Sequence, residues 1–302
     1  MSPLKDKYIN PLTDFGFKRL FGTEPNKTLL IDFLNQILPK KHRIKDLSYS
    51  KNEQLGHNEL DRKAIFDLYC VGETGERFIV EVQKAKQNFF KDRSIYYASF
   101  PIQEQAKMGD WDYRLSAVYT VGILDFIFDE HKTEEELLHV VELKNQRCEV
   151  FYDKLKFLYI ELPKFSKKEE DLETHFDKWL YAFRHLSQLQ DRPKKLQEKV
   201  FEKLFNTAEI AKFTAEEREA YEESLKYYRD LKNVVDTSKE EGISEGIEIG
   251  FEKGMEKGME KGMEKGKNEK NIEIAKKMKQ SGEPIEKITA YTNLRKDEIE
   301  KL

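Results

Sequence analysis

The chain has 302 residues, of which 38% are hydrophobic and 36% charged, and its formal net charge is -4. This length is enough for one large domain or about two domains with hydrophobic cores. The two cysteines are too few for a disulfide framework, and neither has the spacing of a zinc or redox motif. No stretch reaches the roughly 18 apolar residues of a transmembrane helix, and the first residues lack the apolar segment of a signal peptide. We therefore expect a cytoplasmic protein, and neither a membrane-spanning nor a disulfide-rich secreted one.

The first 165 residues alternate between helical and strand-like patterns. Apolar residues at helical spacing predict helices over 27–38 and 91–108. Period-two or continuously apolar patterns predict strands over 44–50, 64–71, 77–84, 115–126, 148–152 and 157–162. The second and third of these strands are expected to form a hairpin. This order of elements indicates a mixed α/β domain over residues 1–165.

The rest of the chain has helical patterns only. Residues 166–235 are predicted to be an all-helical region. In residues 236–270 glycine recurs at every fourth position, and seven interior glycines would cost a helix on the order of 7 kcal/mol relative to alanine. Two interpretations of this EKGM repeat are open: a solvated linker, or a helix that pairs with a partner at its glycines and makes the protein a homo-oligomer. Residues 271–302 predict a small helical hairpin, either a docking element or a fragment of a DNA-binding helix-turn-helix.

Two acids face each other in the predicted hairpin. Strand alternation places Asp67 on one face of the first strand, and Glu81 with Gln83 on one face of the second. A three-residue loop over 73–75, with Gly75 in the left-handed conformation, sets Asp67 opposite Glu81. Such carboxylates repel unless a cation lies between them, and Mg²⁺ prefers a few carboxylates together with water and phosphate oxygens. A two-residue turn would put the acids on opposite faces, and ordinary surface acids are the remaining interpretation.

Several segments carry a resemblance to a known family. They are Asp67 followed after a turn by Glu81-Val82-Gln83, the opening PLTDFGFKRLFG with the helix LLIDFLNQIL, the stretch DRSIYYASFPIQEQAKMGDWDY, the segment AEIAKFTAEEREAYEESLKYYRD, and the glycine-spaced tail. In this order they resemble the Rpn-like family of bacterial recombination-promoting nucleases and transposases, within the PD-(D/E)XK nuclease superfamily. The resemblance implies a restriction-endonuclease-like core with the element order αβββαβ, a mixed sheet, and metal-dependent cleavage of DNA phosphodiester bonds.

The resemblance also assigns roles to the hairpin residues. It implies that Asp67 and Glu81 hold Mg²⁺, or another divalent cation such as Mn²⁺, and that the Val82 carbonyl adds a backbone ligand. Gln83 occupies the place of the lysine in the motif. Its amide can orient water but supplies no positive charge, although the same glutamine form occurs within the resembled family.

Four further residues are candidates for accessory roles. Asp14 is expected to be a third acid near the metal, or the N-cap of the first helix. Lys18 is expected either to replace the missing lysine or to be an ordinary exposed lysine. Arg93 and Gln105 are candidates for phosphate contacts and for orienting neighbouring groups, or for ordinary contacts between helices.

Local charge favours DNA as the partner. Basic residues gather in segments 39–51 and 84–93, where phosphate contacts are expected. The six histidines are scattered without the spacing of a metal site. The leading hypothesis is a cytoplasmic bacterial Mg²⁺-dependent DNA endonuclease, linked to recombination or mobile elements, with the helical and repeat regions serving assembly or DNA engagement. The alternatives are a catalytically inactive DNA-binding or protein-interaction relic of a transposon-type nuclease, and a structural oligomer built around the tail.

Overall fold

The computed structural model describes residues 6–50, 53–54, 64–106 and 112–302. The chain divides into two compact units, Met1–Val234 and Val235–Leu302. The first holds a mixed sheet with helices, and the second is helical. In the part of the chain that is described, every helix is too short or too polar to cross a lipid bilayer.

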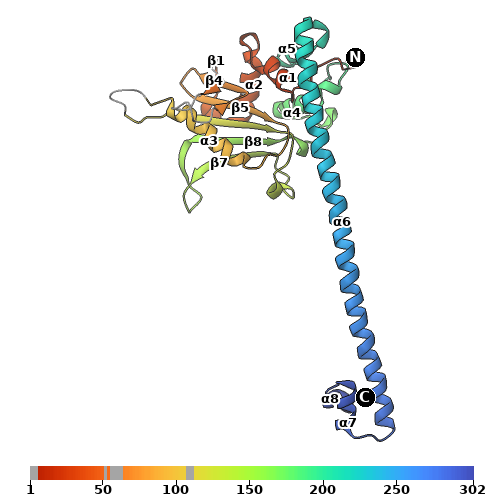
Figure 1. The fold of residues 1–302 in the computed structure, drawn as a ribbon. Coiled ribbons are helices and arrows are strands. Elements are labelled where there is room, and N and C mark those ends of the chain that lie inside the picture. Colours follow the sequence, from red (N-terminus) through yellow and green to blue (C-terminus); the bar gives the residue numbers. More distant parts are fainter. Residues whose placement is uncertain (1–5, 51–52, 55–63, 107–111) are drawn as a thin grey trace. The chain divides into compact units, whose positions relative to one another are not determined.

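A six-stranded mixed sheet forms the centre of the first unit (Figure 1). Its strand order is β1-β4-β5-β6-β8-β7, and a separate pair joins β2 to β3. The strands are β1 (Leu47–Tyr49), β2 (Glu53–Gln54), β3 (Ala64–Ile65), β4 (Leu68–Gly72), β5 (Arg77–Gln83), β6 (Val118–Leu124), β7 (Leu138–Lys144) and β8 (Val150–Glu161). The β5–β6 and β6–β8 pairs are parallel, and the other pairs are antiparallel. The order of α2, β1, β4, β5, α3 and β6 confirms the predicted mixed α/β core.

The far end of the sheet differs from the sequence prediction. The runs 148–152 and 157–162 were expected to be separate strands, but β8 crosses both without interruption. Strand β7 was not predicted at all. It is an edge strand whose residues are mostly exposed or half-buried, so its sequence has neither a strict alternation nor a continuous apolar run.

Helices cover both faces of the sheet. They are α1 (Asp14–Phe21), α2 (Lys27–Ile37), α3 (Phe90–Gln103), α4 (His175–His185), α5 (Lys199–Ala208) and the beginning of α6 (Ala215–Gln280). Alternate β5 side chains show the two layers: Phe78 and Val80 belong to the large core with α1, α2, α4 and α5, whereas Ile79 packs with the aromatic side chains of α3. Helix α3 thus lies on the face opposite the other helices (Figure 1).

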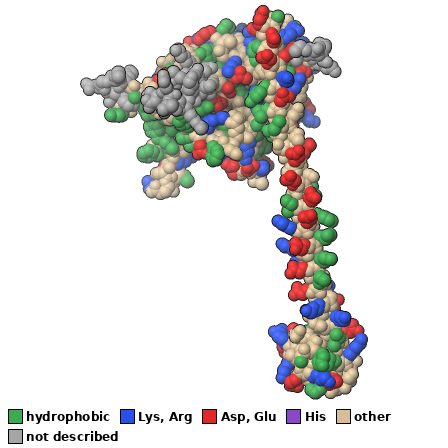
Figure 2. Space-filling model, in the orientation of Figure 1, with side chains coloured by type: hydrophobic (Ala, Val, Ile, Leu, Met, Phe, Trp, Pro, Cys, Tyr) green, Lys and Arg blue, Asp and Glu red, His purple; other side chains and the backbone are tan. Residues whose placement is uncertain are grey.

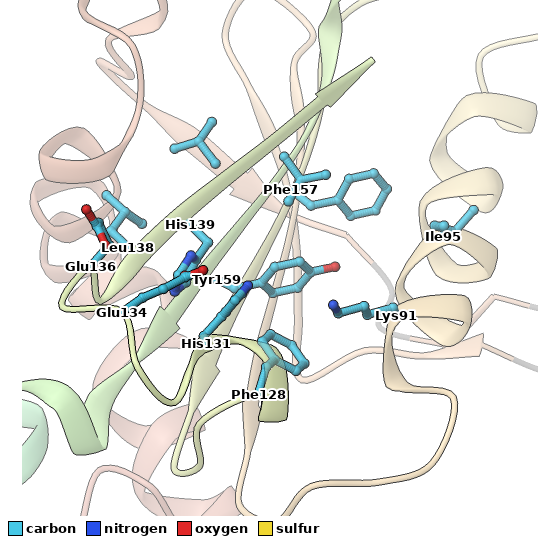
Figure 3. A pocket seen from close by; sticks show the side chains of 12 residues that line it. Lys91, Ile95, Phe128, His131, Glu134, Glu136, Leu138, His139, Phe157 and Tyr159 are labelled. Atoms are coloured by element: carbon cyan, nitrogen blue, oxygen red, sulfur yellow. The ribbon is translucent and has the colours of Figure 1, made fainter. Parts of the chain in front are cut away.

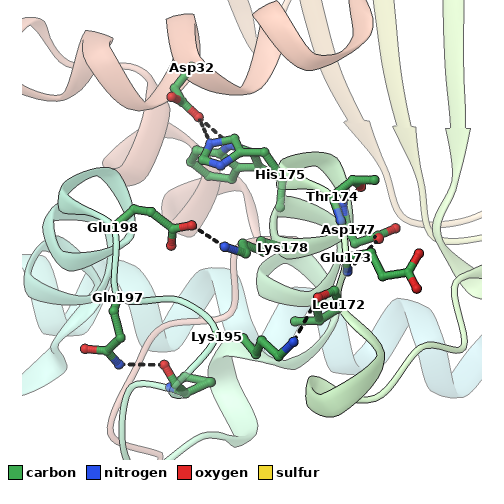
Figure 4. Close-up of polar contacts among 12 residues, drawn as sticks. Asp32, Leu172, Glu173, Thr174, His175, Asp177, Lys178, Lys195, Gln197 and Glu198 are labelled. Atoms are coloured by element: carbon green, nitrogen blue, oxygen red, sulfur yellow. Dashed lines mark hydrogen bonds and ion pairs between the residues drawn. The ribbon is translucent and has the colours of Figure 1, made fainter.

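The segment 166–235 packs into the same core as the sheet. The capping box of Thr174 and Asp177 begins α4, which satisfies backbone N–H groups at the start of the helix. From α2, the Asp32 carboxylate accepts hydrogen bonds from His175 Nε2 at 2.6 Å and Trp179 Nε1 at 2.7 Å (Figure 4). Buried Trp179 also contacts aromatic rings of α1, α2 and α5. These helices therefore support the sheet and do not form a core of their own.

The β4–β5 hairpin has the three-residue register. The paired residues include Leu68 with Val80 and Tyr69 with Ile79. The Gly72 N–H donates to the Glu76 carbonyl at 2.8 Å, and Gly75 has a φ of 88°. A left-handed backbone at this position favours glycine because it has no Cβ. The two-residue turn is therefore wrong, and the next pair outward in the register is Asp67 with Glu81.

The second unit consists of the exposed part of α6 and a small cluster at its end. Residues 235–270 are helical throughout, and a Cβ placed at any of the repeat glycines would have no other atom within 4 Å. Hydrophobic, basic and acidic side chains all reach solvent along this stretch (Figure 2). Beyond it, α7 (Ile285–Thr292) and α8 (Lys296–Glu300) fold back onto the end of α6, where Ala275, Ile288, Leu294 and Ile299 are buried. The expected terminal hairpin therefore has a core only with α6 as a third helix.

Candidate metal centre

Asp67 and Glu81 lie at the end of the hairpin remote from its turn. Glu81 is in β5 between two neighbouring strands, and Asp67 lies at a bend just before β4. The Asp67 carboxylate accepts a hydrogen bond from the Val82 N–H, with Oδ2 at 2.7 Å from the nitrogen. This bond holds Asp67 against β5. The sequence register therefore brings two carboxylates to one end of the sheet.

Tight packing shields most of Glu81 from water and leaves 14% of its side chain exposed. Glu81 pairs across the ladder with Gly122 of β6, which pairs in turn with Tyr159 of β8. A Cβ at Gly122 would lie 2.9 Å from Cδ1 of Tyr159, so only glycine lets this ring lie so close to β6. The result is a carboxylate in a low-dielectric position, where its charged form is disfavoured.

Burial disfavours the charged forms of both acids. Burial and the neighbouring Asp67 charge raise the pKa of Glu81 to about 8, against an opposing effect of Arg93. The Glu81 Oε1 atom is buried without a hydrogen-bond partner, and Oε2 is 3.9 Å from Arg93 Nη2. Burial also raises the pKa of Asp67, although the Val82 N–H opposes this shift. Two neighbouring carboxylates whose charged forms are disfavoured, one of them with an unpartnered oxygen, supply the hard oxygen ligands that suit a divalent cation such as Mg²⁺.

Gln83 contacts protein groups through both ends of its amide. Its Nε2 donates to the Ala85 carbonyl at 2.9 Å, and its Oε1 accepts from Arg93 Nη2 at 2.6 Å. The sequence analysis expected this amide to orient water. In the structure the buried Gln83 instead holds the guanidinium of Arg93 beside Glu81, so the cation comes from α3 and not from the motif position itself.

Asp14 and Lys18 lie near Asp67 and form an ion pair with each other. Thr13, and not Asp14, is the N-cap of α1, because the Thr13 hydroxyl accepts from the Gly16 N–H. Asp14 is the first helical residue and forms an ion pair of 2.8 Å with Lys18. The negative charge of Asp14 contributes to the raised pKa of Asp67. Among the described residues, however, Asp14 is not in a group of three ligand atoms that all lie within 4.8 Å of one another.

Gln105 lies at the opposite end of the sheet. Its Oε1 accepts from the Ser116 N–H at 2.7 Å, and its Nε2 donates to the Pro101 carbonyl at 3.0 Å. Ser116 precedes β6 and is close to Gly75 in the hairpin turn. Gln105 therefore connects the end of α3 to the start of β6. At this end of the sheet it is too far from Asp67 and Glu81 for the predicted accessory role.

Lys84 lies near the acids, and the sequence had placed it in the basic segment 84–93 without a role of its own. It directly follows β5, and its ammonium lies over the rings of Tyr227 and Tyr228 at 5.2 and 5.9 Å from their centroids. Burial lowers the pKa of Lys84, while the charges of Asp14 and Asp67 oppose this shift. The signals in the sequence were its place directly after the motif glutamine and its membership of the basic segment 84–93. Its proximity to the acids depends on α6, which packs on that side of β5.

Comparison with known proteins supplies a family match. The model of the PD-(D/E)XK nuclease family transposases matches residues 11–238, which include both acids, the whole sheet and the beginning of α6. No curated protein matches the chain, and no solved structure does.

Glu81 gives a pH dependence that can be measured. Its folded-state pKa is raised, so its contribution to stability is present below pH 4.5 and is lost as the pH rises towards about 8. In metal-free buffer we expect the unfolding free energy of the wild-type protein to fall as the pH rises, by on the order of a few kcal/mol, at about 1.4 kcal/mol per pKa unit. The Glu81→Gln variant should not show this fall, because its amide does not titrate. Urea denaturation between pH 5 and 8.5 measures this difference.

The matched control is Glu219→Gln, because Glu219 is exposed on α6. This variant should keep the wild-type pH dependence. Mg²⁺ should stabilise the wild-type protein at pH 8 and have little effect on the Glu81→Gln variant. An identical pH dependence in the wild-type and Glu81→Gln proteins would contradict the assignment.

Proposed function

The chain belongs to the PD-(D/E)XK nuclease family transposases, and we propose that it is a divalent-metal-dependent deoxyribonuclease that hydrolyses DNA phosphodiester bonds. The observation that carries the proposal is the pair of partly buried carboxylates at the end of the hairpin, with the buried Glu81 Oε1 atom unpartnered. A cytoplasmic role in recombination or in the life of a mobile element is part of the same proposal.

Asp67 and Glu81 are the residues proposed to hold the cation. Val82 uses its N–H to orient Asp67, and its carbonyl is proposed as a third ligand. Mg²⁺ or Mn²⁺ at this position would supply Lewis-acid activation of water and would offset negative charge on the scissile phosphate. The raised pKa of Glu81 supports this, because a cation there relieves the repulsion that burial of two acids creates.

Positive charge for the transition state is proposed to come from Arg93 and Lys84. Gln83 holds Arg93 by a short hydrogen bond, so the guanidinium is kept in place at the edge of the acids. Lys84 approaches from the opposite layer, where the rings of Tyr227 and Tyr228 restrict its side chain. Fixed charges of this kind stabilise charge that develops during phosphoryl transfer without needing to reorganise.

The basic segments are proposed to contact DNA unequally. In segment 84–93, Lys86 forms an ion pair with Asp129 and Lys91 with Glu130. These two lysines therefore offer less net charge than the sequence suggested. Arg43 and Lys45 are exposed in segment 39–51 and remain candidates for phosphate contacts. Lys51 of that segment lies outside the described residues.

Nicking of supercoiled plasmid tests the nuclease proposal. With Mg²⁺ present, we expect cleavage by the wild-type protein and a loss of at least about 100-fold in Asp67→Asn and in Glu81→Gln, because each removes electrostatic stabilisation at the metal. EDTA should abolish cleavage, and Glu219→Gln should cleave at the wild-type rate.

The outcomes separate the proposal from its rival. Cleavage at the wild-type rate by both acid variants would contradict the site. If the wild-type protein binds DNA but does not cut it with Mg²⁺ or Mn²⁺, the inactive DNA-binding relic is the better description.

Substitutions of two lysines test which of them supplies positive charge to the transition state. Lys84→Met should slow cleavage by about 10- to 100-fold with little change in DNA affinity, because it removes a fixed charge near the acids. Lys18→Met should slow cleavage by less than about threefold, because Lys18 pairs with Asp14 and its side chain is 43% exposed. Single-turnover rates at saturating protein measure both. A larger effect of Lys18→Met than of Lys84→Met would reverse the assignment.

We also propose that the exposed repeat of α6 associates with a second copy of the chain. The apolar residues Ile243, Ile247, Phe251, Met255, Met259 and Met263 form one row at every fourth position, and the glycines form the adjacent row. Such rows run obliquely along a helix, and a ridge of one helix fits the groove of another at a crossing angle near -50°. The large side chains would be the ridge and the glycines the groove, so two copies are self-complementary.

Changes in the apolar row should therefore alter the oligomeric state. We expect the full chain to sediment as an oligomer, and Met255→Glu with Met259→Glu to shift it towards the monomer, because charge in an apolar seam is costly. Glu256→Gln with Glu260→Gln is the control on a neighbouring row and should remain oligomeric. Sedimentation equilibrium gives the mass, and a monomeric wild-type protein would contradict the idea.

A further inference from the structure

Two histidines that are far from any motif meet at one buried carboxylate. His131 follows β6 in a short helical turn, His139 is in β7, and Glu161 ends β8. His131 Nδ1 lies 3.1 Å from Glu161 Oε1, and His139 Nε2 lies 3.0 Å from Oε2. The two imidazole rings are stacked with centroids 3.9 Å apart. Among the described residues, these three form the group of His, Cys, Asp or Glu side chains whose potential metal-ligand atoms all lie within 4.8 Å of one another.

Glu161 is held firmly and is ionised. Its Oε1 accepts the Phe128 N–H at 2.7 Å, and its Oε2 lies 2.8 Å from Lys164 Nζ. Burial alone would raise the pKa of Glu161, but Lys164, the Phe128 N–H and the two imidazoles together lower it. Lys164 also donates to the Glu136 carbonyl, so its position is fixed from two sides. A charged carboxylate in a rigid setting needs little reorganisation to become a metal ligand.

The cluster opens into a cavity of about 640 Å³ (Figure 3). Apolar walls come from Phe128, Leu138, Phe157 and Tyr159, and Lys91 of α3 lies on the far side. Glu134 and Glu136 add carboxylates to the lining. The cavity gives an ion a path from solvent and leaves room for water or a small ligand on its open side.

We propose that His131, His139 and Glu161 bind a zinc-type transition-metal ion, separate from the cation proposed at Asp67 and Glu81. Imidazole nitrogens favour Zn²⁺ and its neighbours over Mg²⁺. Two histidines and one carboxylate with a fourth position open to a cavity are a sufficient ligand set for Zn²⁺. His131 would bind the ion through Nδ1 and His139 through Nε2, each as a neutral imidazole with its proton on the other ring nitrogen, and Glu161 would keep its bonds to Phe128 and Lys164.

Binding requires one local adjustment. The planes of the two rings are 19° from parallel, so their lone pairs do not yet meet at one point. Rotation of one ring about its side-chain torsion corrects this. His131 is the ring with that freedom, because it lies in a short turn, whereas His139 is fixed in the β7–β8 ladder.

Calorimetric titration with Zn²⁺ tests the site without using nuclease activity. The full chain with Asp67→Asn serves as the background, so that the hairpin acids contribute little. We expect one Zn²⁺ per chain, and a loss of at least about 100-fold in affinity when His131→Gln and His139→Gln are added. His185→Gln on α4 is the matched control and should leave binding unchanged.

Co²⁺ gives a second readout on the same proteins. A site with two imidazoles should produce visible absorption bands, which Zn²⁺ displaces and which the His131→Gln variant alone reduces. Circular dichroism checks that each variant is folded. Equal Zn²⁺ affinity with and without the two histidines, or no binding and no Co²⁺ bands in the background protein, would overturn the proposal.

Discussion

Two partly buried carboxylates next to each other at one end of a sheet are the constraint on which the first unit of this protein depends. Asp67 and Glu81 are brought together by the hairpin register, and the surrounding structure leaves each only partly exposed. Burial of like charges is unfavourable unless a cation or a proton compensates them. The raised pKa of Glu81 is the direct sign of that cost, and it connects the stability of the fold to the chemistry proposed for it.

The groups around the acids are proposed to share the role of the single lysine in the motif. Gln83 cannot carry charge, but it fixes Arg93, which reaches Glu81 from α3. Lys84 reaches the acids from the other layer, beside the aromatic side chains of α6. An arrangement of this kind distributes the positive charge over two sheet faces, so the helices that flank the sheet are part of the site as well as of the core.

The exposed helix of the second unit lacks the apolar packing that stabilises the first unit. Its helix has little apolar burial of its own between residues 235 and 270, and its glycines contact nothing. Most helical stability in proteins comes from packing of an apolar face. A helix of this composition would therefore be stabilised by packing against another helix. The row of large apolar side chains beside the row of glycines makes another copy of the same helix a matching surface.

Much of the site was readable from the sequence because it depends on local order. The spacing of Asp67 and Glu81 about Gly75 fixes which residues pair in a hairpin, and strand alternation follows from backbone geometry. The αβββαβ order was readable for the same reason. The edge strand β7 was not, because an exposed edge imposes no clear pattern.

The tertiary structure alone decided which distant groups meet. It moved Gln105 to the other end of the sheet and gave the cap of α1 to Thr13. It brought Arg93 of α3 to Glu81, and the rings of Tyr227 and Tyr228 to Lys84. It also brought His131 and His139 to Glu161, although nothing in their spacing suggested a metal site. The sequence by itself thus determined the acids and their register, since these are short-range consequences of alternation and turn geometry. The cations and the histidine cluster depend on the packing of elements far apart in the chain, which no local pattern records.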